Sequence, residues 1–167
     1  MKIKMVQDGT LQSPIEKLES TTNLKEMSEH VLKEFSDISD IALEEMKDSD
    51  RELLGIINIS DNGKILNWNT VSIGTINKVL CEPRDVFKTS ILSNAAAIFM
   101  FHCHPNGDPT PSQDDIEVAK IFIEAGELLR IPLVDSMIIG CGTDNACSLR
   151  WSYPELFSDE PFINIEE

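Results

Sequence analysis

The chain has 167 residues, 41% of them hydrophobic and 26% charged, a balance that indicates a soluble globular protein rather than a disordered or membrane-embedded one. Fourteen Lys and Arg against twenty-nine Asp and Glu give a net charge of −15, which argues against direct binding to a phosphate backbone. The longest uninterrupted apolar run, residues 95–101, has strand length and is far shorter than the ~20 residues of a membrane span.

The chain begins with a segment of weak pattern. Residues 1–23 show no sustained periodicity and predict a loosely ordered arm. Over residues 24–47 apolar side chains recur at steps of three and four, which predicts one or two amphipathic helices with a solvated acidic face. We therefore expect three regions: an N-terminal arm with helices over 1–47, a folded domain over 48–153 and an acidic tail over 154–167.

The next segment predicts a hairpin, a helix and a buried strand. Residues 53–59 form a β-rich run, and Asn62-Gly63 is the dipeptide preferred in two-residue hairpin turns. The return arm covers 64–69, with 71–73 as an extension. A helical pattern starts near Pro83 and leads into residues 95–101, which predict a central strand buried on both faces.

The last third predicts a loop, a helix and two strands. Residues 102–111 are too rich in Pro and Gly for regular structure. Ser112 has the position of a helix N-cap with Asp115 at the capping-box position, and Gly126 is the expected helix terminator. Strands are expected at 133–139 and 147–151. The order of elements fits a mixed α/β class.

Two histidines at the end of the buried run indicate a metal site. Residues i and i+2 of a strand point to the same face, so His102 and His104 can present two imidazoles side by side. Asp115, on the first turn of the following helix, can fold back as a third ligand and leave one position open for water. Two His and one carboxylate are typical of a catalytic zinc centre, where zinc lowers the pKa of its water to about 7.

The stretch His102-x-His104-Pro105-x6-Ser112-x2-Asp115 resembles, without a gap, the metalloprotease motif of the JAB/MPN (JAMM) family. The flanking segments are similar to the bacterial RadC branch: Val71-Ser-Ile-Gly-Thr-Ile-Asn, Pro83-Arg-Asp-Val-Phe-Lys, Asn94-Ala-Ala-Ala-Ile and Pro105-Asn-Gly-Asp-Pro-Thr-Pro-Ser. The similarity covers about residues 49–149. It implies a cytidine-deaminase-like α/β fold, a mixed β-sheet flanked by helices, and a zinc-dependent hydrolase of peptide, isopeptide or related amide bonds.

The resemblance also implies a role for each site residue. The two histidines and Asp115 hold Zn²⁺. Glu52, ahead of the first strand of the hairpin, acts as general base and then general acid. Ser112 donates a hydrogen bond to the metal-bound water or to the tetrahedral oxyanion. Asp114, the neighbouring carboxylate, is expected to face solvent.

Two positions depart from the RadC pattern. Cys103 stands where RadC-like sequences usually have Asn, and strand alternation turns it away from the metal. Ser136 follows Asp135 where those sequences usually have His, so a contact near the site is missing. A Cys103 thiolate nucleophile would be a different enzyme class, but no third residue is placed to orient a base for it.

Each candidate also has a structural interpretation. An H-x-H pair can simply be two polar residues at a strand end, and Ser112 with Asp115 can act only as a helix cap worth about 1 kcal/mol. The aromatic residues Trp68, Phe101 and Trp151 are expected to pack rather than to bind substrate. Cys81, Cys103, Cys141 and Cys147 show no CxxC spacing and indicate reduced thiols without a disulfide framework.

Three functions remain from the sequence. The first is the zinc hydrolase, with a protein or peptide substrate and no nucleic-acid or membrane partner. The second is a non-catalytic binding module that acts through its acidic surface and N-terminal helices. The third, a DNA repair-associated factor, is suggested only by the likeness to RadC, and the charge of −15 opposes it. The chain start lacks the apolar stretch of a secretory signal, so we expect a cytoplasmic location.

Overall fold

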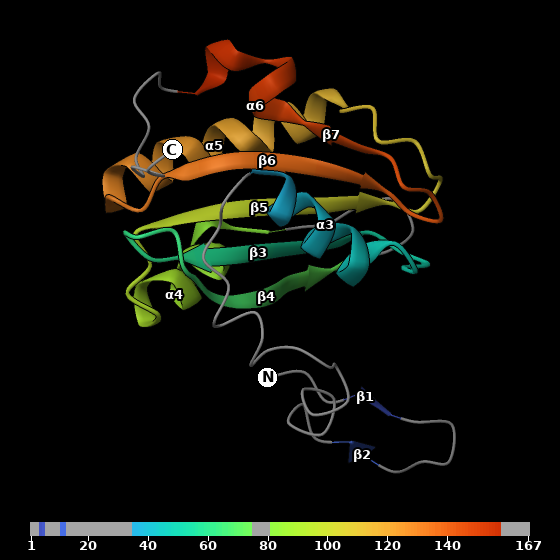
Figure 1. The fold of residues 1–167 in the computed structure, drawn as a ribbon, viewed down its shortest axis with the longest axis horizontal. Helices are drawn as coiled ribbons and strands as arrows, with labels where there is room; N and C mark the ends of the chain where they lie inside the picture. The colour runs from blue at the N-terminus through green and yellow to red at the C-terminus, as the bar shows by residue number, and fades with distance from the viewer. Residues whose placement is uncertain (1–3, 6–10, 13–34, 75–80, 158–167) are drawn as a thin grey trace.

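A five-stranded mixed sheet forms the centre of the computed structural model, which describes residues 4–5, 11–12, 35–74 and 81–157 (Figure 1). The strand order is β4-β3-β5-β6-β7. The strands are β3 Leu53–Ile59, β4 Ile65–Ile73, β5 Ala97–His104, β6 Leu133–Gly140 and β7 Ala146–Ser148. β5 and β6 pair in parallel, and the other neighbours are antiparallel. The predicted mixed sheet flanked by helices is therefore confirmed.

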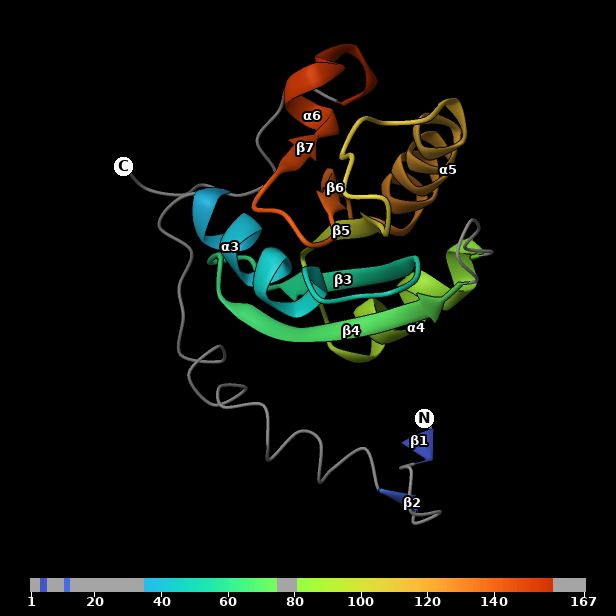
Figure 2. The same ribbon diagram turned by 90° about the vertical axis from the view of Figure 1, so that its right-hand side faces the viewer.

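Helices cover both faces of this sheet (Figure 2). Helix α3 (Phe35–Met46) lies on one face, and α4 (Pro83–Leu92) and α5 (Gln113–Leu129) lie on the other. The short helix α6 (Leu149–Ser152) and the 3-10 turn η1 (Pro154–Leu156) follow β7. None of the described helices combines the length and the apolar character that a membrane crossing requires.

The two ends of the chain are described only in part. A short antiparallel pair, β1 (Lys4–Met5) with β2 (Leu11–Gln12), falls within the predicted arm. The helical pattern over 24–47 is described from Phe35 onward, where α3 forms, and residues 24–34 lie outside the described part. The end of the predicted tail, 158–167, also lies outside it.

Strand β5 divides the core into two apolar clusters. Alternate residues such as Phe99 and Phe101 pack beneath α3, whereas Ile98 and Met100 pack beneath α4 and α5. Trp68 of β4 stacks on Phe101 with 5.5 Å between ring centroids, which confirms the packing role expected of both. The strand is buried on both faces, as predicted, but it continues to His104 instead of ending at residue 101.

The turn between β3 and β4 differs from the predicted two-residue hairpin. Gly63 N–H donates to the Ser60 carbonyl, so the two central residues of the turn are Asp61 and Asn62. Gly63 follows them with a φ of 75°, and the Ser60 N–H closes the loop on the Lys64 carbonyl. Glycine is therefore needed one position later than a type I′ turn would place it, because it takes the left-handed conformation after the turn.

Helix α5 continues past the glycine that was expected to end it. Gly126 is buried inside the helix, where an added Cβ would lie 2.7 Å from the Ile131 carbonyl oxygen. The left-handed residue at the C-terminus is instead Arg130, with a φ of 57°. Gly126 therefore serves close packing against the following chain rather than helix termination.

The predicted strand over 147–151 is also wrong in its second half. β7 ends at Ser148, whose hydroxyl caps α6 by accepting the Trp151 N–H. The buried carboxylate of Asp135 accepts hydrogen bonds from the Ser148 hydroxyl and the Arg150 N–H, and this favours a turn away from the sheet. Trp151 is 87% exposed, so its predicted packing role is wrong.

Candidate metal centre

The two histidines lie at the C-terminal end of β5, on the face of the strand that points toward α5. His102 and His104 share the face of Met100, whereas Cys103 between them points into the cluster beneath α3. The imidazole rings lie edge to face, with 5.0 Å between centroids and 84° between planes. The alternation expected of a strand thus brings both rings to one site.

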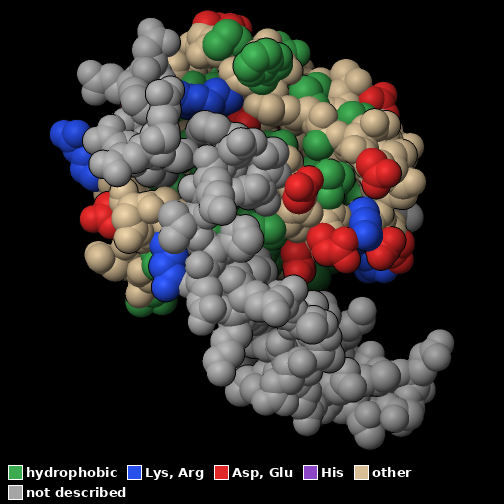
Figure 3. Space-filling model, viewed as in Figure 1, with side chains coloured by type: hydrophobic (Ala, Val, Ile, Leu, Met, Phe, Trp, Pro, Cys, Tyr) green, Lys and Arg blue, Asp and Glu red, His purple; other side chains and the backbone are tan. Residues whose placement is uncertain are grey.

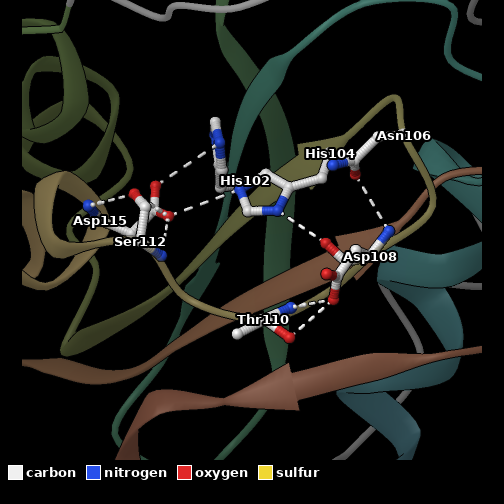
Figure 4. Close-up of polar contacts among 7 residues, drawn as sticks. All are labelled: His102, His104, Asn106, Asp108, Thr110, Ser112 and Asp115. Carbon is white, nitrogen blue, oxygen red and sulfur yellow. Dashed lines mark hydrogen bonds and ion pairs between the residues drawn. The ribbon is translucent and has the colours of Figure 1, made fainter.

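Asp115 completes a cluster of three ligand atoms. Its Oδ1 lies 3.6 Å from His102 Nε2, and its Oδ2 lies 3.4 Å from His104 Nε2 (Figure 4). One ligand atom from each of the three residues lies within 4.8 Å of the others. Ligands at zinc distances of about 2.0–2.1 Å in a tetrahedron are about 3.3 Å apart, so this donor set fits a zinc-sized cation.

The first turn of α5 fixes the Asp115 carboxylate. Ser112 is the N-cap, and its hydroxyl accepts the Asp115 N–H at 3.2 Å. In return, Asp115 Oδ2 accepts the Ser112 N–H at 2.8 Å and the Ser112 hydroxyl at 2.6 Å. This capping box orients the carboxylate toward the histidines, so the residue that caps the helix is also the candidate third metal ligand.

A loop between β5 and α5 fixes the second histidine. The Asp108 carbonyl lies 2.8 Å from His104 Nδ1 and can only accept, so Nδ1 carries the proton and Nε2 of the neutral ring keeps its lone pair for a metal. The Asp108 carboxylate accepts the Thr110 N–H and hydroxyl at 2.9 and 2.6 Å. Asn106 Oδ1 accepts the Asp108 N–H at 3.0 Å (Figure 4).

Burial and neighbouring charges shift the pKa values of His102, His104 and Asp115 in different directions. Burial lowers the pKa of His102 to about 4, against the opposing effect of Asp115. Contact with Asp115 raises the pKa of His104 despite partial burial. Burial alone would raise the pKa of Asp115, but its contacts with His104 and Ser112 outweigh this and hold it well below its usual range. At neutral pH the site therefore offers an anionic carboxylate and a neutral His102.

Glu52 lies directly before β3, at the edge of this centre. The β3–β5 ladder ends with the pair Leu54 and His102, and Glu52 lies two residues beyond it, toward the His104 end of β5. The charge of Glu52 is the smallest of the influences that raise the pKa of His104, after the dominant contact with Asp115. The Glu52 carbonyl accepts the Gly74 N–H at 2.8 Å.

The remaining candidates lie as follows. Ser112 is exposed, and its hydroxyl donates to Asp115. Asp114 is exposed, as expected. Cys103 is fully buried and contributes no ligand atom to the cluster. Ser136 is buried in β6 opposite Met100. All four cysteines are free thiols.

The sequence did not reveal the contacts that support the ligands. The Asp108 carbonyl accepts from the His104 ring, and a backbone contact in which Leu53 accepts raises the pKa of His102. Every residue type has a main-chain carbonyl, so the sequence does not indicate which carbonyl contacts a histidine ring. Only the Asn-x-Asp-x-Thr spacing in the loop, whose side chains are of the kind that bond to nearby backbone, could have indicated them.

Comparison with known proteins agrees with the fold. Residues 32–152 match the family described as RadC-like JAB domain. A UPF0758 protein of Moorella thermoacetica is 41% identical over 116 residues, which cover 70% of this chain and 51% of that protein. UPF0758 proteins of Syntrophomonas wolfei and Halalkalibacterium halodurans are 40% and 37% identical, over 68% and 70% of this chain and 47% and 50% of theirs. The chain thus spans about half the length of these curated relatives.

Proposed function

The chain belongs to the RadC-like JAB domain family, and from this premise we propose that it is a zinc-dependent hydrolase of peptide, isopeptide or related amide bonds. The observation that carries the proposal is the convergence of His102, His104 and Asp115, whose ligand atoms lie within 4.8 Å of one another. Zinc held there would polarise the amide carbonyl and lower the pKa of water to about 7.

Glu52 supplies proton transfer in this proposal. The attacking water forms a bond from its oxygen to the amide carbon and gives a proton to the Glu52 carboxylate. The carbon–nitrogen bond then breaks, and Glu52 returns the proton to the leaving nitrogen. The effect of its charge on His104 supports this role, because it indicates a carboxylate near the ligands that is not a member of the cluster.

Ser112 is the proposed hydrogen-bond donor to the developing oxyanion. In the structure its hydroxyl donates to Asp115 Oδ2, so it must release this oxygen in order to serve the oxyanion. The Ser112 N–H contact to the same oxygen, at 2.8 Å, stays in place when the hydroxyl turns. Asp115 therefore remains oriented during the proposed step.

The charge distribution supports a protein or peptide substrate over a nucleic acid. The net charge is −15, and on the face drawn in Figure 3 the Lys and Arg side chains are scattered among acidic and neutral ones. We propose a protein or peptide partner and a cytoplasmic site of action.

Replacing Glu52 with Gln separates catalysis from metal binding. We expect turnover of internally quenched peptides and of lysine-isopeptide substrates to fall by at least ~10³-fold, while zinc content stays at the wild-type level. Asp114→Asn, an exposed carboxylate on the first turn of α5, is the matched control and should retain activity. Equal turnover by wild type and Glu52→Gln would reject the hydrolase and favour the non-catalytic binding module.

A further inference from the structure

The residue between the two histidines points to the opposite side of the sheet. Cys103 is fully buried in the cluster beneath α3, among residues such as Phe101 and Ile139. The imidazoles before and after it face α5. Its thiol therefore cannot ligate the same ion, and its contacts lead elsewhere.

Those contacts reach both neighbours of Glu52. Cys103 Sγ accepts the Leu53 N–H at 3.3 Å and donates to the Arg51 carbonyl at 3.4 Å. Regular pairing between β3 and β5 extends only to Leu54 with His102. The thiol thus joins the two strands at the point where their backbone pairing ends, one residue on either side of the proposed base.

The main chain at Glu52 is held from two strands. The Gly74 N–H, directly after β4, donates to the Glu52 carbonyl at 2.8 Å, and the Cys103 thiol binds the flanking residues from β5. The Arg51 carbonyl also accepts the Ser49 hydroxyl at 2.6 Å. Because the Arg51 carbonyl has this second donor, the hydrogen bond from the Leu53 N–H is the more direct measure of what the thiol contributes.

We propose that Cys103 is a positioning residue for Glu52, its buried thiol fixing the main chain on both sides of that residue. The inference rests on the proposed function, because the position of Glu52 matters for turnover only if Glu52 transfers protons. A displacement of about 1 Å in a reacting group can lower a rate by ~10²-fold, so two hydrogen bonds at the neighbouring residues have a measurable effect.

Four variants separate hydrogen bonding from packing. Cys103→Ser keeps a donor and an acceptor at this position, whereas Cys103→Ala removes both. Cys103→Val removes both but fills the volume, so it carries the test if the alanine variant does not fold. Ile139→Val trims the residue paired with Cys103 on β6 and has no polar contact with residues 51–53, which makes it the packing control.

The first measurement is hydrogen exchange of the Leu53 amide, followed by NMR on the zinc-loaded full chain. We expect exchange to be at least about tenfold faster in Cys103→Ala and Cys103→Val, and within about threefold of wild type in Cys103→Ser and Ile139→Val. Unchanged exchange in the alanine and valine variants would overturn the proposal, as would an equal increase in all four.

The second measurement is kcat and KM on the internally quenched peptides that wild type cleaves. We expect kcat to fall about tenfold or more in Cys103→Ala with KM and zinc content unchanged, and to recover in Cys103→Ser. Faster Leu53 exchange with unchanged kcat would overturn the positioning role. If Glu52→Gln has no effect, the proposed function itself fails and the positioning role fails with it; the exchange data then show only whether the thiol holds the strand.

Discussion

His102 is the most deeply buried member of the candidate metal centre, and its side chain is only 12% exposed. Burial lowers its pKa to about 4, against an ordinary value of 6.5, so the folded protein holds the ring neutral. The unfolded chain, in contrast, takes up a proton below pH 6.5. His102 therefore makes the stability of the metal-free protein depend on pH.

The difference between the folded and unfolded pKa of His102 sets the direction in which stability changes with pH. The lowered pKa of His102 contributes folding stability that is fully present above pH 6.5 and is lost as the pH falls toward 4. The difference between the two pKa values corresponds to about 3 kcal/mol of unfolding free energy. His104 has a raised pKa and acts in the opposite direction, with stability lost as pH rises. We expect urea unfolding of metal-free wild type to show lower stability at pH 4.5 than at pH 6.5.

The His102→Gln variant is the control for this prediction, because glutamine does not titrate. Its unfolding free energy should decline less between pH 6.5 and pH 4.5 than that of wild type, since all other titrating groups remain. Identical slopes in the two metal-free proteins would show that His102 is not buried in its neutral form.

At the residue scale, the sequence predicted the side chains that come together where a pattern fixes both residue type and spacing. The His-x-His alternation and the Ser-x-x-Asp cap each specify residue types and spacing, so both could be read from the sequence. The supporting Asp108 carbonyl and the Cys103 contacts could not, because they depend on which main-chain groups the fold brings near.

At the scale of elements, the loop between β5 and α5 acts as a support for the centre. Gly107 has a φ of 81°, which favours glycine, and Gly140 at the end of β6 leaves room for the Gly107 carbonyl. The Asp108 carboxylate closes the loop on Thr110, and its own carbonyl meets His104. The loop conformation thus determines which nitrogen of His104 is available.

Opening this loop should weaken metal binding without removing a ligand. We expect Asp108→Ala to bind zinc about tenfold more weakly than wild type in competition with a chromogenic chelator, because the Asp108 carbonyl is then less well held against His104. Asp114→Ala removes the same charge from an exposed position and should match wild type. Equal affinity in the two variants would assign the loop no part in holding His104.

Element types were easier to predict than element ends. Buried runs and apolar spacing identified the strands β3, β5 and β6 and the helices α4 and α5. The ends depended on tertiary contacts: Gly126 stays helical because it packs against residues 131–133, and the chain turns after Ser148 because Asp135 is buried beside it. Such partners are distant in the sequence, so local pattern does not reveal them.

At the scale of the whole molecule, the sheet brings remote segments to one edge. Glu52 directly precedes β3 and the histidines lie at the end of β5, and antiparallel pairing sets these two ends together. The loop and α5 return Asp115 to the same edge. The site is therefore a product of strand order and register, which the family resemblance indicated and local pattern alone did not specify.

Isothermal titration of the metal-free chain with zinc tests the central claim most directly. We predict one class of site with about one zinc ion per chain in wild type, and loss of that site in His104→Ala, because an ion bound by two histidines and Asp115 needs all three ligands. Zinc uptake that is absent in wild type, or the same in wild type and His104→Ala, would contradict the account.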